Sequence, residues 1–490
     1  MKSRPCIWMS VACLAAALTM TIQLPAQGNA PNNHQPRYRL VDLGTFGGPN
    51  SIVPTGPPLF KVLNNQGTVV GAADTSIPDP YPYCFLFCYV SHPAKWQNGS
   101  PTDLGALPGV NSGVAFGLNE LGVIVGLSEN GSIDPLTGYP AYDAVVWNNG
   151  RMSNLGTFGG SVSGAAAVNN WGQVVGFAAN TIPDSYASSL GPCATLDCWP
   201  VATQLRAFLW QNGRKQDLGT LGGNDAVADL VNDLGFVGGV SYTNNIPSDL
   251  GIPTMDPFVW IGGRMIDLGT LGSGHFSYPN WMNLWGQTVG NSAPSDFWYH
   301  GFVWDGGRMR DLGTPLGGDF STANWINDAG QVVGDASFSG DEAWHAVRWE
   351  NGRATDLGAI AGDSCSDAES INNAGEIVGS STNCSEDVHG FLWENGVMYD
   401  LNALIPPGSN LALVDPLDIN DNGEITGGAL LPDGTQHAFL LIPCNEHDPG
   451  NCQNQLLAAE ENTNRSPLPP QRVKSGRDPM EHFHAPNYSR

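Results

Sequence analysis

Positively charged side chains are scarce in this sequence of 490 residues. Lys and Arg together number 20, against 46 Asp and Glu, and the formal net charge is −26. A protein that holds nucleic acid or an anionic membrane by charge needs a basic face. The composition therefore disfavours both kinds of partner.

The sequence also lacks the short motifs of common catalytic sites. It contains no Gly-x-Ser-x-Gly, no His-Glu-x-x-His and no P-loop. A pair of carboxylates that cleaves glycosidic bonds stays open, because the chain has 46 acidic residues and nothing marks which two would act. The sequence favours a protein without catalytic activity and leaves an enzyme as the alternative.

Long apolar runs are absent except at the N-terminus. Lys2 and Arg4 precede an apolar stretch over 6–22, and a plausible cleavage region follows at 25–30. About 17 apolar residues without stop-transfer charges are typical of a cleaved signal peptide rather than a membrane span. We expect residues 1–27 to be removed and the mature chain to have no membrane span. It would then be secreted or displayed at the cell surface. A periplasmic location, or a lipoprotein anchored at Cys13, is the alternative.

Cysteine use agrees with export. Beyond the signal there are eight: Cys84, Cys88, Cys193, Cys198, Cys365, Cys384, Cys444 and Cys452. An even count in an exported chain favours disulfides, although the spacing alone does not fix their connectivity. We expect local pairing, 84 with 88, 193 with 198, 365 with 384 and 444 with 452. No second pair stands at zinc-finger spacing, so we expect no metal site built on these cysteines.

One pattern, Asn-x-x-Gly, occurs eight times. Its asparagines are Asn64, Asn119, Asn169, Asn232, Asn283, Asn327, Asn372 and Asn420. An apolar residue precedes each Asn, and a β-branched run ending in Gly generally follows each Gly. The spacing between successive asparagines of this series is the length of one repeat, and internal repeats of such a length indicate stacked supersecondary units. Asn-x-x-Gly itself is typical of a tight turn between two strands.

Each repeat predicts four antiparallel strands, which we call A to D in chain order. Asn-x-x-Gly joins strands A and B, and a long loop joins B to C. An Asn-Gly or Gly-Gly hairpin signal follows strand C in seven repeats, and strand D carries Asp-Leu-Gly or a variant. In these seven repeats strand C ends at a tryptophan: Trp96, Trp147, Trp210, Trp260, Trp304, Trp349 and Trp393. Positive φ at both central residues of a type I′ turn favours these dipeptides.

A four-stranded sheet with two apolar faces must bury both of them, and radial stacking of such sheets does so. The sequence therefore predicts an all-β fold: a β-propeller of eight four-stranded antiparallel blades over 37–443. Residues 38–44 resemble a lone strand D, and 437–442 end the chain on a lone strand C, so the first strand can close the last blade. Seven blades are the alternative. Residues 444–490 are predicted to form a tail that is pinned by a disulfide and mostly disordered.

The sequence resembles a family of bacterial extracellular proteins with repeats named HAF, for His-Ala-Phe. His437-Ala438-Phe439 matches the tripeptide, with variants beginning at His389, His300, His345 and Arg206. A companion motif, Asp-Leu-Gly-Thr-Leu-Gly-Gly, stands at 217–223. The resemblance covers about residues 40–442. It implies export and a repeat fold, and it carries over no catalytic residues and no known ligand.

Ligand binding is expected on the face that holds the long B–C loops, because variable loops on a rigid scaffold are where binding usually occurs. The largest loops, over 72–91 and 177–205, are rich in aromatic residues, Pro and Cys. The candidate ligand contacts are Tyr81, Tyr83, Phe85, Tyr186 and Trp199. We expect a monomeric scaffold that binds an extracellular protein or polysaccharide, with a carbohydrate-active hydrolase or lyase, or a structural surface protein, as alternatives.

Recurring polar residues are interpreted as structural. The Asp of Asp-Leu-Gly is expected to be a buried carboxylate that accepts backbone N–H groups. The His that begins strand C in five repeats is expected to bond the strand end. No cofactor is expected; calcium at the acidic stretch 363–369, near Glu386 and Asp387, is a weaker interpretation. Trp171 and Trp285, inside A–B turns, would either stack on a sugar ring or fold over the neighbouring blade.

Overall fold

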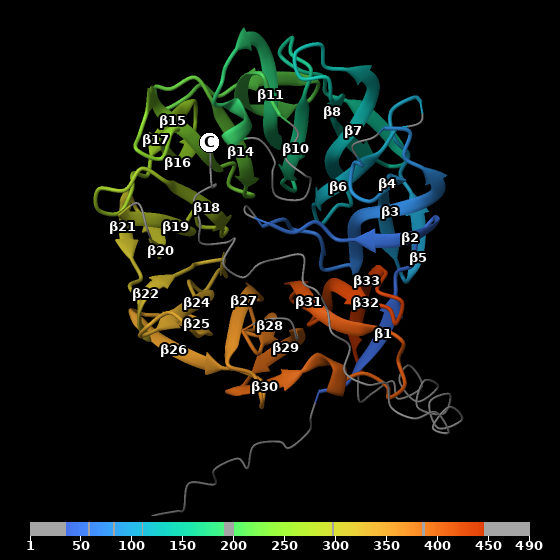
Figure 1. The fold of residues 1–490 in the computed structure, drawn as a ribbon, viewed down its shortest axis with the longest axis vertical. Coiled ribbons are helices and arrows are strands. Elements are labelled where there is room, and N and C mark those ends of the chain that lie inside the picture. Colours follow the sequence, from blue (N-terminus) through green and yellow to red (C-terminus); the bar gives the residue numbers. More distant parts are fainter. Residues whose placement is uncertain are drawn as a thin grey trace, which may run out of the picture. The chain divides into compact units, whose positions relative to one another are not determined.

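The computed structural model describes residues 36–56, 59–81, 84–109, 111–190, 200–295, 298–384 and 388–444. These residues form eight antiparallel sheets arranged as a closed ring, as Figure 1 shows in a view along the ring axis. The prediction of an eight-bladed propeller is confirmed, and the seven-bladed alternative is wrong. The predicted signal peptide and all of the predicted tail except Cys444 lie outside the described residues.

Blades 1 to 4 follow one another along the chain. Blade 1 contains β2 (Gly47–Ile52), β3 (Thr68–Pro78), β4 (Tyr89–Gln97) and β5 (Ser100–Asp103). Blade 2 contains β6 (Gly113–Leu118), β7 (Ile124–Ile133), β8 (Pro140–Asn148) and β9 (Arg151–Asn154). Blade 3 contains β10 (Ser163–Val168), β11 (Val174–Pro183), β12 (Thr203–Gln211) and β13 (Arg214–Asp217), with the 3₁₀ turn η1 (Ala187–Ser189) in its B–C loop. Blade 4 contains β14 (Ala226–Val231), β15 (Val237–Pro247), β16 (Pro253–Ile261) and β17 (Arg264–Asp267).

Blades 5 to 8 complete the ring. Blade 5 contains β18 (Ser277–Met282), β19 (Thr288–Ser295), β20 (Trp298–Asp305) and β21 (Arg308–Asp311). Blade 6 has a divided strand A, β22 (Gly317–Ser321) and β23 (Trp325–Ile326), followed by β24 (Val332–Phe338), β25 (Trp344–Glu350) and β26 (Arg353–Gly358). Blade 7 contains β27 (Cys365–Ile371), β28 (Ile377–Thr382), β29 (Val388–Glu394) and β30 (Val397–Asp400), with η2 (Leu401–Ala403) after it. Blade 8 contains β31 (Ala412–Ile419), β32 (Ile425–Leu430), β33 (Gln436–Pro443) and β1 (Tyr38–Asp42).

The ring closes through its first strand, as the sequence predicts. Strand β1 pairs antiparallel with β33, from Tyr38 opposite Pro443 to Asp42 opposite Phe439. Without β1, the outer edge of β33 would expose unpaired backbone groups. The first strand therefore supplies strand D of the last blade and joins the two ends of the repeat region.

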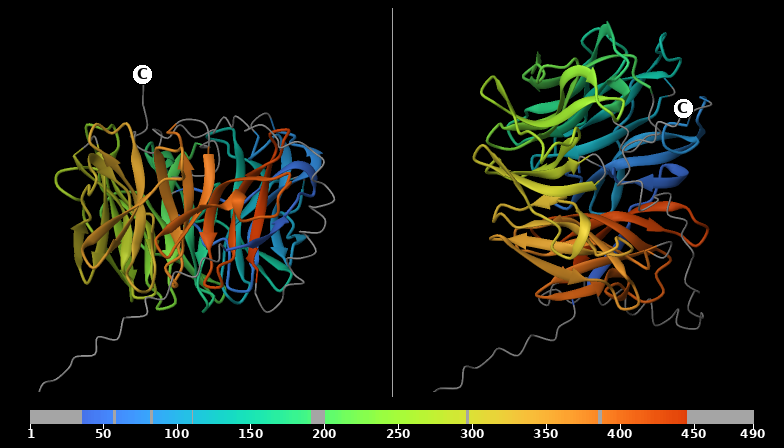
Figure 2. Two further views of the ribbon diagram at one scale, coloured as in Figure 1. Left: turned by 90° about the horizontal axis from the view of Figure 1, so that it is seen from below. Right: turned by 60° about the vertical axis from the view of Figure 1, so that its left-hand side comes forward.

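The tight turns have the predicted geometry, and they give the ring two different faces (Figure 2). In all seven C–D hairpins both central residues have positive φ, as type I′ turns require, for example Asn149 at 50° and Gly150 at 71°. The glycine of every Asn-x-x-Gly turn also has positive φ, between 68° and 85°. A–B turns and C–D hairpins lie together on one face, which we call the turn face. B–C loops and D–A connections lie on the other, which we call the loop face.

The core lies between blades. Six of the seven strand-C tryptophans are at most 8% exposed, and Leu441 takes the equivalent place in blade 8 at 0%. Each belongs to a hydrophobic cluster that includes apolar side chains of a neighbouring blade. Burying one large aromatic side chain contributes a few kcal/mol. The predicted ring of aromatic residues therefore stabilises the contacts between blades.

Blade 1 departs from the repeat in a way that the sequence interpretation missed. Its strand A ends at Ile52, and the chain then enters the centre of the ring before the turn at Asn64, as the blue segment in Figure 1 shows. Phe60 stacks on Phe116 of blade 2, with ring centroids 5.0 Å apart. Leu59 packs on the opposite side, against the hydrophobic cluster that contains Trp325 and Ile371. We call the described residues 53–56 and 59–61 the axial segment.

The B–C loops are shorter than predicted, because strand B extends beyond its buried part. In blade 1 the expected loop over 72–91 is occupied by strand up to Pro78, which pairs with Tyr89 after a shift in register. The same extension is seen in blades 2, 3 and 4. Among the described residues no helix has the length and apolar character needed to cross a membrane.

Candidate functional site: the axial funnel

The turn asparagines form a closed ring of hydrogen bonds around the axis. The Nδ2 of each donates to the backbone carbonyl of the next at 2.9–3.2 Å, in the order Asn64, Asn119, Asn169, Asn232, Asn283, Asn327, Asn372, Asn420 and back to Asn64. The side chains are at most 7% exposed. Each blade is thus tied to the next at the same point.

The same amides also build the turns. The Oδ1 of Asn327 accepts the backbone N–H groups of Ala329 and Gln331, at 3.1 and 3.0 Å. The other seven turns have the equivalent pair of bonds. An Asp could accept these two bonds, but only Asn also carries a donor for the next blade. This explains why all eight copies of the turn use Asn.

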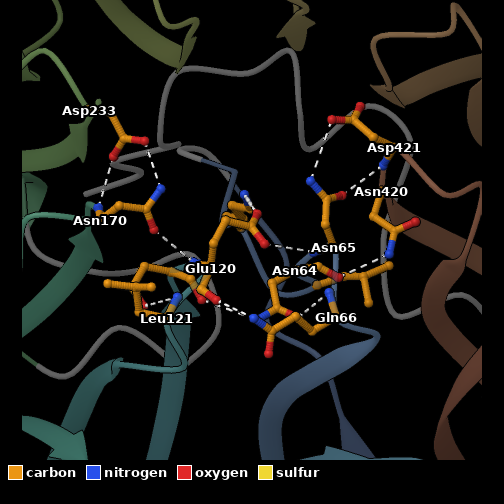
Figure 3. Close-up of polar contacts among 12 residues, drawn as sticks. Asn64, Asn65, Gln66, Glu120, Leu121, Asn170, Asp233, Asn420 and Asp421 are labelled. Carbon is orange, nitrogen blue, oxygen red and sulfur yellow. Dashed lines mark hydrogen bonds and ion pairs between the residues drawn. The ribbon is translucent and has the colours of Figure 1, made fainter.

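A second layer of polar contacts, which we call the collar, is formed by the residue after each turn asparagine: Asn65, Glu120, Asn170, Asp233, Leu284, Asp328, Asn373 and Asp421. Seven of these residues accept, through a side-chain oxygen, the backbone N–H of the collar residue in the preceding blade. Asp233 and Asp421 each accept a side-chain amide as well. Figure 3 shows the part of the collar from Asp421 through Asn65 and Glu120 to Asp233. The chain of contacts is interrupted at Leu284, which has no polar side chain.

Inside these two layers lies a cavity of about 300 Å³, to which all eight blades contribute. We call it the axial funnel. Its walls include seven of the eight turn asparagines (all but Asn64), the collar residues and the ends of the A strands. Leu59, Phe60 and Lys61 of the axial segment also line it. Trp281 and Trp325 form an aromatic wall, with stacked rings whose centroids are 3.6 Å apart. Trp281 keeps a partly exposed surface in the cavity. The funnel therefore combines an aromatic surface with amide and carboxylate groups.

The charged groups that line the funnel have different surroundings. Lys61 forms an ion pair with Glu120. Asp418 is 3% exposed and accepts the backbone N–H groups of Val62 and Leu63, which ties blade 8 to blade 1. Burial raises the pKa of the Asp418 carboxyl to about 7. This carboxyl is therefore committed to closing the ring.

Asp229 is the exception among these groups. It lies in the bulge of β14 and lines the funnel, where its side chain keeps some accessible surface. Burial raises the pKa of this carboxyl to about 7. No hydrogen bond or ion pair connects its carboxyl to another described residue. A carboxyl group in this position can accept from, or donate to, a ligand in the funnel.

The rim of the funnel carries two exposed tryptophans. Trp171 and Trp285 are 70% and 61% exposed. Each donates its Nε1–H to a carbonyl in the turn of the next blade, Trp171 to Asp233 at 2.8 Å and Trp285 to Asp328 at 2.9 Å. Both side chains thus fold over the neighbouring blade, as one of the two interpretations of the sequence had it, and most of each ring surface stays exposed.

The ligand contacts predicted on the loop face do not form a single aromatic surface. Phe85 is 1% exposed and belongs to a hydrophobic cluster that spans blades 1 to 5, so its ring is occupied by packing. Tyr186 packs against the same cluster, and its carbonyl accepts the hydroxyl of Tyr242. Tyr81 is partly exposed at the start of a turn capped by Asp79. Tyr83 and Trp199 lie outside the described residues.

The disulfides are local where the structure describes them. Cys84 bonds Cys88 within one loop, and Cys365 bonds Cys384 across the A and B strands of blade 7. Cys444 is disulfide-bonded as well. Its predicted partner Cys452, and the predicted pair Cys193 and Cys198, lie outside the described residues.

The histidines of strand C bond the strand end, as expected. In blades 1, 5, 6 and 8 the His Nδ1 lies 2.8–2.9 Å from the Asp of Asp-Leu-Gly: His92 with Asp103, His300 with Asp311, His345 with Asp356, His437 with Asp42. These Asp side chains also accept the N–H of the glycine two residues on. They are 40–44% exposed, so the prediction that they are buried is wrong. Strand D is the outermost strand, which leaves its side chains open to solvent.

Blade 4 breaks this pattern. Asp256 stands where six blades have His or Arg, and it faces Asp267 of the same blade. Blade 2 has Asp143 at this position, but that carboxylate accepts the side-chain amide of Asn154 instead of facing a second carboxyl group. Burial and the charge of Asp267 raise the pKa of the Asp256 carboxyl to about 7. Two carboxyl groups thus replace an ion pair at this position.

Metal ligands are not gathered anywhere in the described part of the chain: it contains no group of three or more His, Cys, Asp or Glu side chains placed to hold an ion. In the acidic stretch 363–369, Asp363 accepts the hydroxyl of Ser381 and contacts His389. Glu386 and Asp387 lie outside the described residues. The Asp363 carboxylate is therefore already bonded within blade 7.

Sequence reasoning missed the funnel, although two signals pointed to it. Asn64 follows Asp42 by 22 residues, whereas Asn372 follows Asp356 by 16, and the excess contains Pro54 and Gly56 of the axial segment. The second signal is Asp229, a charged residue in a strand A that is otherwise apolar and buried except at its last residue. Neither signal reveals that eight blades would bring these residues to one axis.

Comparison with known proteins gives similar solved structures but no family. No family model matches the chain, and no curated protein matches it. The β-propeller domain of the Trilobed protease from Pyrococcus furiosus is 8% identical with a TM-score of 0.40, covering 65% of this chain and 89% of that one. A puromycin hydrolase S511A mutant complexed with PGG is 12% identical with a TM-score of 0.39, and covers 90% of this chain. The alignment spans 58% of the hydrolase chain.

Proposed function

We propose that this chain is an exported β-propeller of the HAF-repeat kind that binds a carbohydrate without cleaving it, through a terminal sugar unit held in the axial funnel. The sequence features that favour export and the resemblance to HAF repeats support the first part. The funnel supports the second, because it is the place where all eight blades converge on one cavity. We expect a monomer that acts outside the cell or at its surface.

The funnel has the chemistry that a sugar needs. Its volume of about 300 Å³ lies at the lower end of the range for small-molecule sites. Trp281 offers an aromatic face for the C–H surface of a pyranose ring, and the side chains of the collar residues offer polar groups for its hydroxyls. Asp229 carries the proposal, since its enclosed carboxyl otherwise lacks a partner among the described residues. A sugar hydroxyl would supply that partner.

Binding is favoured over hydrolysis by the state of the carboxyl groups in the funnel. A glycosidase needs two carboxyls that are free to act on the substrate. Asp418 already accepts two backbone N–H groups, and Glu120 is paired with Lys61. Asp233, Asp328 and Asp421, the other carboxylates of the funnel lining, each accept a backbone N–H group from the preceding blade. Among the lining carboxyls only Asp229 lacks a bond to another described residue, and a single carboxyl supports recognition rather than this two-carboxyl chemistry.

Direct binding measurements on the secreted protein test the proposal. A glycan array identifies the ligand, and calorimetry with that glycan measures affinity for the wild type and for Asp229→Asn. The variant replaces one carboxyl oxygen by an N–H₂ group, so a ligand hydroxyl that donates to that oxygen would face a second donor. Losing that buried hydrogen bond is expected to weaken binding about tenfold. Asp433→Asn is the matched control, because Asp433 is exposed on the loop face. Binding that is indifferent to Asp229→Asn, or a glycan that is cleaved, overturns the proposal.

The loop face is the second candidate for ligand contact. The observation in its favour is Tyr81, which is partly exposed in a loop constrained by the Cys84–Cys88 disulfide. If the glycan is held there, Tyr81→Ala weakens binding and Asp229→Asn does not. The two variants together therefore assign the ligand to one face.

A further inference from the structure

The turn face is divided into two halves of different chemistry. At the third position of the Asn-x-x-Gly turn, blades 2 to 5 carry Leu121, Trp171, Leu234 and Trp285, which are 72%, 70%, 56% and 61% exposed. The other four blades carry Gln66, Ala329, Ala374 and Asn422 at this position. Large apolar side chains in equivalent places on four consecutive blades form a continuous arc, unlike the scattered exposed apolar residues of an ordinary surface.

A second arc of arginines lies outside the first. The C–D hairpins of blades 2 to 5 begin strand D with Arg151, Arg214, Arg264 and Arg308, all exposed. None of the four forms an ion pair with another described residue. Gln211, which precedes one hairpin, donates its side-chain amide to the carbonyl of Trp171, so turn and hairpin lie side by side. Four of the 20 basic residues of the chain are thus collected beside the apolar arc.

The opposite half of the same face is acidic. Glu376 and Glu424 occupy the position after the turn glycine in blades 7 and 8. Burial and the nearby charge of Glu376 raise the pKa of Glu394. In blade 6 the hairpin arginine, Arg353, stands opposite Glu350 in the sheet, as Arg308 of blade 5 stands opposite Asp305, whereas Arg214 stands opposite Gln211 and Arg264 opposite Ile261. The net charge of −26 therefore conceals a local separation of charge.

We propose that the apolar and arginine arcs of blades 2 to 5 dock this propeller onto the surface of an anionic lipid bilayer. Exposed Leu and Trp at turn tips insert at the level of the lipid headgroups, and arginines beside them contact the lipid phosphates. The Leu residues favour a bilayer over a soluble acidic polysaccharide, since an isolated sugar offers a Leu tip little to bury against. The acidic half is repelled by the same surface, so the ring tilts and blades 6 to 1 point away from it.

The proposal is independent of the funnel and is tested with vesicles. The secreted protein is sedimented with vesicles of phosphatidylglycerol and phosphatidylcholine, and with vesicles of phosphatidylcholine alone. Binding is expected to the first only and to fall steeply as salt increases. Arg214→Gln and Arg264→Gln are each expected to weaken binding about fivefold. The double change Leu121→Gln and Leu234→Gln is expected to abolish it, and none of these Leu side chains forms a polar contact that folding needs.

Two matched controls separate this surface from others. Ile182 and Ile246 are 53% and 75% exposed on the loop face, and the double change Ile182→Gln and Ile246→Gln should leave binding intact. Arg353→Gln, at the equivalent hairpin of blade 6, should have a smaller effect than Arg214→Gln. Asp229→Asn is expected to leave vesicle binding unchanged. Failure of the proposed sugar site in the funnel can therefore be distinguished from failure of the proposed docking on a bilayer. The inference is overturned if the protein does not bind anionic vesicles at low salt, or if it binds only a soluble polyanion. It is also overturned if the loop-face variant loses as much vesicle binding as the turn-face variants.

Discussion

Replacing Asn327 by Ala should strongly destabilise the ring. The side chain is 4% exposed, accepts two N–H groups of its own turn, and donates to Asn372 at 3.0 Å in the next blade. Each of these three bonds is worth about 1 kcal/mol net, and a buried partner left unsatisfied costs more. We therefore expect a loss of about 3–4 kcal/mol in the free energy of unfolding. Urea unfolding followed by tryptophan fluorescence measures it.

Asn327→Asp removes the amide donor and keeps the acceptor of the turn. The carboxylate loses the bond to the Asn372 carbonyl in the next blade and the bond to Oε1 of Gln331 at 2.7 Å in its own turn, so a loss of about 1–3 kcal/mol is expected. The matched control is Asn212→Gly in an exposed hairpin, where φ is 52° and Gly is tolerated; the expected change is within about 0.5 kcal/mol. If Asn327→Asp is as harmless as Asn212→Gly, the ring of amides does not hold the blades together.

The remaining predictions concern closure, pH and the exceptional blade. Deleting 37–45 removes β1 and should lower the melting temperature by roughly 10 °C or more, whereas unchanged melting would mean that the ring does not depend on closure. Stability should rise as pH falls from 8 to about 5, because Asp229, Asp335 and Asp418 have pKa values of about 7 in the folded state and about 4 when unfolded. Between these values the folded state binds more protons than the unfolded state, and a stability maximum at pH 8 would contradict this. Asp42 raises the pKa of His437, whose stabilising charge is present at low pH and lost as pH rises, so it acts in the same direction. Asp256→His should restore the ion pair seen in other blades and add about 1 kcal/mol at pH 7, and a lower urea midpoint would refute that interpretation.

The repeat unit could be predicted from the sequence because its determinants are local. Asn-x-x-Gly and Asn-Gly specify turns through the backbone of a few adjacent residues, and alternating apolar residues between them specify strands. Eight copies then predict eight blades, and the unpaired strands at the two ends predict closure. The local disulfides at Cys84 and Cys365 follow from the same short-range geometry.

The site could not be predicted in this way, because its parts come from different blades. Phe85 was predicted to contact a ligand, and only packing among blades decides that its ring is buried. The amide of Asn64 could be assigned to its own turn, but its bond to Asn119 exists only once 55 intervening residues form a neighbouring sheet.

The sequence by itself determined the strands, the turns and the number of blades, since these depend on contacts within one repeat. The tertiary structure decided what fills the axis and how the turn face is divided, because those properties depend on which side chains eight separate blades bring together. Asp229 is an unremarkable acid in one strand, and it becomes a candidate ligand contact only in the closed ring.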